Sequence, residues 1–363
     1  MKATVKDDTK GQIQLQFNWI FVIIIGAVLL GFFFSLTGTQ TDVAEKSITS
    51  STARQLETII TSTAQKSGTF KKYTEIPQRE LSFHCDSSNG IYHYEISNIR
   101  AGTTKHDILF SPKRFTPENI YTWTLDWTVP YKMTTFTYLT HDDHAFVFYD
   151  DKGDNFKMLY KPFPKNMTHV IYNESTKQGF SIEELNYDDY TFVFFEDQNI
   201  PDDLKNKIRG ESSLVIKIEP EKTDIFSYGT VSFIPGDDYA SDSEGEKAPY
   251  FGKASLYGAM FSGSKQLYQC TMDKAYSYMH MVTLMQLDRV EHIIPRVKPA
   301  CQRLLGGVDD GIPRAKHHLN NISTIVNSSI DTSSDVENLY KYTREIEDSN
   351  HRLSMEGSCP LIY

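Results

Sequence analysis

Acidic residues follow three apolar segments that read as β-strands, and carboxylates at such places can bind cations or polar ligands. The segments are AFVFYDD at 145–151, THVIYNE at 168–174 and YTFVFFED at 190–197. Their closing acids are Asp150, Asp151, Glu174, Glu196 and Asp197. Ligands of open α/β sheets bind beyond the carboxyl ends of the strands, so these acids are candidate ligand-binding residues. Helix caps and loops use the same residue types, and this is the simpler interpretation.

A denser group of chemically capable residues precedes the first of these strands. His141, Asp142, Asp143 and His144 are consecutive, and imidazole and carboxylate groups are both metal ligands. Neighbouring residues of a strand point to opposite faces, so four consecutive side chains meet at one ion only where the backbone turns. The favoured hypothesis is a polar loop that enters the strand at Ala145, with no bound metal or other cofactor.

The sequence offers no further catalytic signature. It contains no GxGxxG fingerprint, no P-loop and no GxSxG nucleophile elbow. A phosphate cradle or a strained serine nucleophile is therefore not indicated. No catalytic residue is assigned, and an enzyme is the function least favoured.

The strands around these acids predict an α/β domain over residues 136–235. Two more apolar strands, SLVIKIEP and YGTVSFIP, follow at 213–220 and 228–235, and short helical segments separate the strands. Strands that are apolar on both faces are typical of a sheet covered by helices on both sides. We therefore expect a Rossmann-like, mostly parallel sheet, closed by an acidic, Ser/Gly-rich linker at 236–250.

The flanking segments predict other structure. Residues 69–135 are β-rich, because LSFHC and IYHYEI alternate about the turn sequence SSNG, as in a β-hairpin. The segment YTWTLDW predicts a strand ending near Pro130, with an aromatic ligand platform as the alternative. Residues 251–363 are mainly helical, with helices expected at 275–294, 313–329 and 334–353 from their apolar spacing.

Residues 17–36 predict a transmembrane helix. The run FNWIFVIIIGAVLLGFFFSL carries no charge, and about 20 apolar residues cross a bilayer core as a helix. A signal peptide is the alternative, although its apolar core usually has only about 7–15 residues. Lysines in the cytoplasmic segment 1–16 orient the rest outward by the positive-inside rule. Residues 37–68 predict a stalk helix that stops at Gly68.

Cysteines and glycosylation sequons agree with an outward placement. Four cysteines, Cys85, Cys270, Cys301 and Cys359, form an even set that is compatible with two disulfides. Three pairings are possible, and four free thiols are the alternative. The sequons begin at Asn166, Asn173, Asn321 and Asn327. We expect a glycoprotein in the cell membrane, with most of the chain extracellular.

Charge and composition limit the partners. The net charge is -10 and the sequence pI is about 5.6, whereas a general nucleic-acid surface needs a concentrated basic face. Nucleic acid is therefore not an expected partner. The expected partners are the lipid bilayer and other surface proteins, or further copies of the chain through the N-terminal helix.

Several motifs resemble known sequences. The junction at Gly11 and Gln12, in KGQIQLQFNWIF, resembles the class III (type IV pilin-like) signals of archaea, which are cut between these two residues. Together with ILFSPKRF, YTWTLDWTVPYKMTTFTYLT, GKASLYGAMFS and the terminal SCPLIY, it resembles uncharacterised membrane-anchored surface proteins of small-genome archaea. The resemblance implies an anchored exterior protein and assigns no catalytic or binding residue. An uncleaved anchor is the favoured reading of the junction.

These observations rank the function classes. First is a non-enzymatic surface protein that acts in surface structure, adhesion or partner binding. Next are a membrane-tethered ligand-binding or sensory module that uses the edge of the α/β sheet, and a pilin-like subunit. An envelope enzyme comes last.

Overall fold

The computed structural model describes most of the chain. The described backbone comprises residues 9–64, 66–74, 76–86, 91–103, 108–149, 154–172, 186–196, 198, 202–209, 212–222, 224–239, 244–306, 308–309 and 312–363. The chain divides into two units, Met1–Thr52 and Ala53–Tyr363. Each unit is considered by itself.

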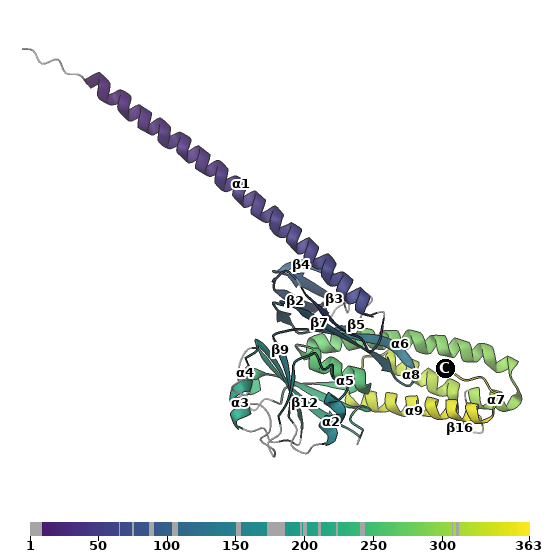
Figure 1. Cartoon of the computed structure of the whole chain (residues 1–363). Helices are drawn as coiled ribbons and strands as arrows, with labels where there is room; N and C mark the ends of the chain where they lie inside the picture. The colour runs from purple at the N-terminus through teal and green to yellow at the C-terminus, as the bar shows by residue number, and fades with distance from the viewer. Residues whose placement is uncertain are drawn as a thin grey trace, which may run out of the picture. The chain divides into compact units, whose positions relative to one another are not determined.

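The first unit consists, where it is described, of helix α1 (Thr9–Ala64), whose last residues belong to the second unit (Figure 1). Within Trp19–Phe34, thirteen large apolar side chains are between 43% and 75% exposed. Among the residues that the structure describes, no helix was found with the length and hydropathy needed to cross a bilayer.

A four-stranded sheet, which we call the small sheet, has the order β4-β3-β2-β6. Its strands are β2 (Leu81–Asp86), β3 (Ile91–Ile96), β4 (Ile99–Thr103) and β6 (Arg114–Phe115). Strands β2 and β3 pair antiparallel, as the hairpin prediction requires. One face, including Phe83 and Tyr94, packs on Leu56 and Ile60 from the end of α1. This helical segment therefore covers one face of the small sheet.

A second four-stranded sheet, the middle sheet, has the order β1-β7-β8-β5. Its strands are β1 (Phe70–Tyr73), β5 (Ile108–Phe110), β7 (Ile120–Thr128) and β8 (Lys132–His141). The predicted strand before Pro130 is present as β7. Its Trp123 and Trp127 are 4% and 0% exposed, so they belong to the core and form no ligand platform.

The main sheet has six strands in the order β10-β9-β11-β12-β13-β14. They are β9 (His144–Tyr149), β10 (His169–Tyr172), β11 (Asp189–Phe195), β12 (Ser213–Pro220), β13 (Tyr228–Pro235) and β14 (Glu246–Phe251). The first four strands in this order are parallel, whereas β13 and β14 are antiparallel. The expected mostly parallel sheet is present. Its last two strands return by short connections, which only antiparallel neighbours allow.

Part of the expected acidic linker belongs to this sheet. Residues 236–250 contain the short helix α4 (Gly236–Tyr239) and most of β14. Pro249 occupies this edge strand, where a residue without an N–H is tolerated. Ala248 and Tyr250 are buried. The prediction of a linker was wrong for this part, because buried apolar residues follow the acidic ones.

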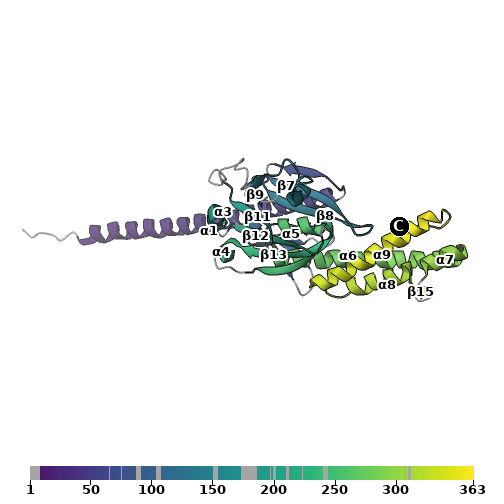
Figure 2. The ribbon, with the colours of Figure 1, turned by 90° about the horizontal axis from the view of Figure 1, so that it is seen from below.

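Helices cover both faces of the main sheet (Figure 2). Leu204 and Ile208 of α3 (Asp202–Ile208) pack on one face. The opposite face shares a core with α2 (Asp154–Tyr160), α5 (Gly252–Phe261) and α6 (Lys265–Ile293). The remaining helices are η2 (Ile294–Arg296), α7 (Pro299–Leu305), α8 (Ala315–Val326) and α9 (Ser333–Met355); β15 (Val308–Asp309) and β16 (Ile312–Pro313) form a two-stranded ribbon. The expected C-terminal helical region is therefore present.

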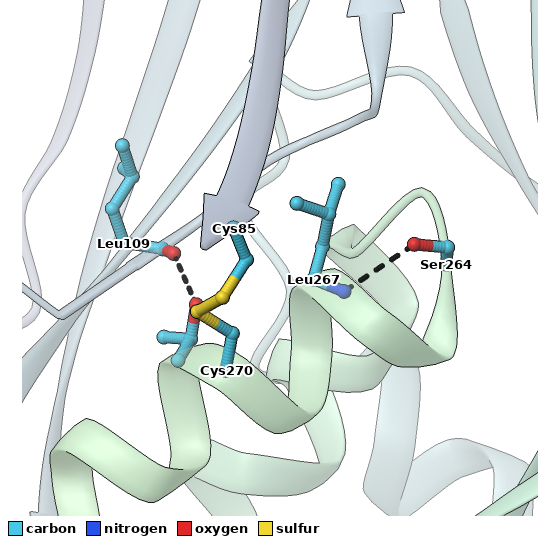
Figure 3. Close-up of a disulfide and its surroundings, with 6 residues drawn as sticks. Cys85, Leu109, Ser264, Leu267 and Cys270 are labelled. Atoms are coloured by element: carbon cyan, nitrogen blue, oxygen red, sulfur yellow. Dashed lines mark hydrogen bonds between the residues drawn. A yellow bond between two sulfur atoms is a disulfide. The ribbon is translucent and has the colours of Figure 1, made fainter. Parts of the chain in front are cut away.

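Two disulfides join the cysteines in order along the chain. Cys85 of β2 is bonded to Cys270 of α6 (Figure 3), and Cys301 of α7 is bonded to Cys359 near the C-terminus. Beside the first disulfide, the Thr271 hydroxyl donates a hydrogen bond to the Leu109 carbonyl over 2.9 Å. The first disulfide ties the small sheet to α6, and the second ties the C-terminal tail to the helices.

Candidate functional site

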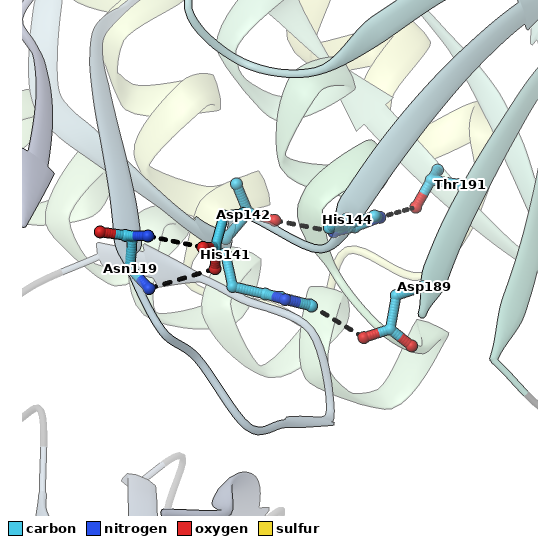
Figure 4. Close-up of polar contacts among 7 residues, drawn as sticks. Asn119, His141, Asp142, His144, Asp189 and Thr191 are labelled. Carbon is cyan, nitrogen blue, oxygen red and sulfur yellow. Dashed lines mark hydrogen bonds and ion pairs between the residues drawn. The ribbon is translucent and has the colours of Figure 1, made fainter. Parts of the chain in front are cut away.

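The His141–His144 segment is a tight connection between two sheets. Strand β8 ends at His141 and β9 begins at His144, with Asp142 and Asp143 forming the turn (Figure 4). The expected polar loop is present and is very short. Both histidines are buried, at 2% and 5% exposure.

His141 is held on two sides. Its Nε2 lies 2.8 Å from Asp189 Oδ2 at the start of β11, and its ring stacks on Phe115 at 4.8 Å. Its Nδ1 is buried and has no hydrogen-bond partner among the described residues. Because no described hydroxyl or thiol group is hydrogen-bonded to this nitrogen, the described residues do not form a catalytic triad with the Asp–His pair.

His144 lies between two threonines. Its Nδ1 is 2.7 Å from Thr140 Oγ1 and its Nε2 is 2.9 Å from Thr191 Oγ1. Burial, with a smaller contribution from His141, lowers the pKa of His144 well below its ordinary value. The imidazole is therefore neutral at physiological pH, and both of its nitrogens face threonine hydroxyls and not a carboxylate that would orient a general base.

The two acids of the turn have separate environments. Asp142 accepts hydrogen bonds from the Asn119 backbone N–H at 3.1 Å and from its Nδ2 at 2.6 Å. Burial raises the pKa of this carboxyl, but the bonds from Asn119 outweigh it and lower the pKa. Burial and the neighbouring charges of Asp142 and Asp188 raise the pKa of Asp143. In the described part of the chain, no three His, Cys, Asp or Glu side chains gather as a metal site would require.

The acids expected at the carboxyl ends of the strands are not brought together in the described residues. Asp150, Asp151, Glu174 and Asp197 lie outside those residues. Glu196 is described, and it is exposed just beyond the end of β11.

A cavity of about 620 Å³ instead lies at the opposite, amino edge of the main sheet. Its described lining comes from six segments of the chain: the segment entering β6, the starts of β9, β11 and β12, the end of β13, and the α5–α6 turn. The polar lining residues are Lys113, Arg114, His144, Asp189, Thr191, Ser212, Ser213, Ser262 and Ser264. A concave site with converging polar groups is the usual form of a ligand pocket.

One side of this cavity carries positive charge. Lys113 and Arg114 are exposed there, and Arg114 Nε lies 3.5 Å from Glu80 Oε1. Ser264 caps the N-terminus of α6, accepting a hydrogen bond from the Leu267 N–H at 3.3 Å. The N-terminus of a long helix adds a partial positive charge beside these residues.

The absence of a side chain at Gly263 allows the start of α6 to lie directly against the segment that contains Lys113. Its N–H donates to the Ser111 carbonyl over 3.1 Å. A Cβ at position 263 would lie 2.3 Å from the Lys113 backbone nitrogen, so a larger residue would push the two segments apart. The start of α6 and the basic residues are therefore immediate neighbours.

The other side of the cavity is built from the starts of parallel strands. The register places Asp189 beside His144 and Thr191 beside Leu214. Asp189 keeps one carboxylate oxygen on His141 and is partly exposed. This side therefore offers acceptor oxygens and hydroxyl groups.

Sequence reasoning missed this cavity. Its charged residues, Lys113, Arg114 and Asp189, have no shared spacing that would have pointed to a site. Ligands of open α/β sheets usually bind beyond the carboxyl ends of the strands, so the sequence pointed to the carboxyl edge. In the structure, the small sheet and the α5–α6 turn line a cavity at the amino edge.

The modification candidates differ in exposure. Asn166 and Asn327 are exposed, whereas Asn321 is half-buried in α8 and its Nδ2 lies 2.9 Å from His317 Nε2. Asn173 lies outside the described residues. Gly11 and Gln12 fall within the backbone of α1.

Comparison with known proteins gave no match: no family model, no curated protein and no solved structure resembles this chain significantly. The proposals below therefore depend on the residues themselves.

Proposed function

We propose that this chain is a membrane-anchored protein of the cell exterior whose outer part acts by binding and not by catalysis. The observation that carries the proposal is the pair of disulfides, which uses all four cysteines. Disulfides persist in oxidising compartments and are rare in the cytosol.

The anchor is supported by the sequence. The uncharged run spans residues 17–36. The structure describes the side chains of residues 19–35 within this run. Within 19–35 the apolar side chains lie on the helix surface. Apolar surface of this extent is costly in water and stable in a bilayer.

Binding is favoured over catalysis by the polar groups of the site. In the part of the chain that the structure describes, no nucleophile is hydrogen-bonded to Nδ1 of His141 in the His141–Asp189 pair, and His144 is neutral and held by threonines. The cavity nevertheless combines a basic side, an acidic side and hydroxyl groups. These groups suit recognition of a polar ligand.

Membrane extraction tests the anchor. The full chain, expressed in a bacterial host with an oxidising envelope, should stay in the membrane pellet after alkaline carbonate washing. The double variant Ile24→Asp/Val28→Asp should move to the soluble fraction, because each central aspartate costs about 3 kcal/mol of insertion energy. The matched variant Ser50→Asp/Gln55→Asp, at exposed positions of the same helix, should stay in the pellet. Recovery of the unaltered chain in the wash would refute the anchor.

Placement outside the cytoplasm needs a second measurement. Protease added to intact spheroplasts should digest the C-terminal part of the chain. Peptide mapping without reduction should recover the Cys85–Cys270 and Cys301–Cys359 linked peptides. Free thiols together with protection from protease would contradict the proposed placement.

A pilin-like subunit is a second candidate, favoured by the Gly11–Gln12 junction ahead of the apolar run. This function predicts a mature chain that begins at Gln12 after co-expression with an archaeal prepilin peptidase. N-terminal sequencing that finds Met1 intact under these conditions would exclude it.

A further inference from the structure

We infer that the cavity at the amino edge of the main sheet binds an acidic saccharide, with the ligand's carboxylate on the basic side and its hydroxyl groups on the Asp189 side. This inference names the ligand class of the site used in the proposed function, and it rests on that function.

The charge of the lining favours an anionic group. The chain as a whole has a net charge of -10, yet the described residues that line the cavity include two cations, Lys113 and Arg114, and one anion, Asp189. The N-terminus of α6 adds positive potential on the same side as the cations, because Gly263 lies against Lys113. A carboxylate there would gain charge-assisted hydrogen bonds.

Arg114 is available to such a ligand. Its contact with Glu80 is 3.5 Å long, and both side chains are substantially exposed, at 61% and 36%. An exposed pair of this kind is worth little, so a ligand carboxylate can replace Glu80 at small cost.

The opposite side of the cavity favours hydroxyl groups. Asp189 presents carboxylate oxygens, of which His141 engages one. Ser212 is an exposed lining residue that adds a hydroxyl at the start of β12. Acceptor oxygens and hydroxyls together match the vicinal hydroxyl groups of a sugar, which donate and accept in turn.

The size and the apolar lining also suit a saccharide. About 620 Å³ is within the range of small-ligand pockets. Pro112, Leu214 and Pro235 line the cavity, and they can cover the C–H face of a sugar ring. A simple anion such as phosphate would leave both this surface and Asp189 unused.

Calorimetry on the full chain in detergent tests the inference. The probes are digalacturonate, cellobiouronate, neutral galactobiose, glutamate and inorganic phosphate, each at low and at high NaCl. We expect binding of at least one acidic disaccharide, weakened by salt, and no binding of galactobiose. Lys113→Glu should weaken that binding at least about tenfold, the loss expected for one charge-assisted hydrogen bond.

Two controls separate the site from general charge. Lys341→Gln, on the exposed surface of α9, should leave the affinity unchanged. Asp188→Asn, at an exposed position next to the site, should also change little, whereas Asp189→Asn should weaken binding. Because Lys113 is exposed, Lys113→Glu tests the site even if Asp189→Asn fails to fold.

The outcomes are distinct. Equal affinity for galactobiose, tightest binding of glutamate or phosphate, or no binding by any acidic disaccharide would each overturn the inference. These results would leave the anchored placement intact, because membrane extraction and peptide mapping measure it independently.

Discussion

The small sheet and the main sheet bury their apolar strands in different ways. The main sheet is covered by helices on both faces and shares one continuous core with α5, α6 and α9. The small sheet has its own core, which contains the last turns of α1 and the start of α6. The comparison indicates that the smaller core depends more on single cross-connections, since a small core yields little net stability.

The largest expected effect concerns the cross-connection between these regions. Removing the Cys85–Cys270 disulfide with Cys85→Ser/Cys270→Ser should lower the free energy of unfolding by about 5 kcal/mol, because it closes a loop of 185 residues in the unfolded chain. The pair Cys301→Ser/Cys359→Ser is the matched control, with a loop of 58 residues and an expected loss of about 4 kcal/mol. Urea unfolding measures both values. A larger loss for the second pair would break the comparison.

The next effect tests the core of the small sheet from the side of α1. Leu56 is 2% exposed in that core, so Leu56→Ala should cost about 3 kcal/mol through lost burial and the cavity left behind. Gln55→Ala, at the exposed neighbouring position, should be nearly neutral in the same urea titration. Equal effects of the two variants would show that α1 does not support the small sheet.

Lowering the pH should decrease the stability of the main sheet through His144. Its pKa in the folded protein is far below 6.5, so the unfolded chain binds the proton first. The stability gained from the neutral ring is present above about pH 6.5 and is lost as the pH falls, by up to about 1.4 kcal/mol per pH unit. The difference between wild type and His144→Gln should follow this slope in urea titrations from pH 7 to 5. Gln55→Ala, an exposed change that removes no titratable group, should leave the pH dependence of the wild type unchanged.

Glycosylation should have the smallest effect on stability. It distinguishes the two regions because the sequons lie outside the small sheet. None of the four sequons lies within the segments 81–103 and 114–115 that span the small sheet. In an archaeal host that glycosylates such sequons, Asn166 and Asn327 should carry glycans because they are exposed, and Asn321 should not because α8 half-buries it. Glycopeptide mass spectrometry reads all three sites. A glycan on Asn321 together with an unmodified Asn166 would contradict the prediction that exposure decides which sequons are glycosylated.

The sequence predicted those elements whose local pattern matches their surroundings. The runs AFVFYD and YTFVFFED are apolar on both faces, and both became central strands of the main sheet. Strand β14 was missed because its residues follow an acidic, glycine-containing segment and include Pro249. Its place in the sheet comes from antiparallel pairing with β13, which no local pattern encodes.

The candidate site was less predictable than the fold. The pattern of residues 141–144 correctly indicated a polar turn, but Asp189 is 48 residues from its partner His141. Lys113 and the α5–α6 turn meet the strand starts only through tertiary packing. Disulfide pairing is of the same kind, since four cysteines allow three arrangements and only the folded chain selects one.

Under the exterior placement that we propose, the order of the cysteines has a consequence for disulfide formation. The first cysteine bonds the second, and the third bonds the fourth. A chain that crosses a membrane from its N-terminal side presents Cys85 and Cys270 to an oxidant before Cys301 and Cys359 arrive. Pairing each cysteine with the next to emerge therefore gives the native bonds directly, so a chain placed as we propose would need no disulfide isomerase.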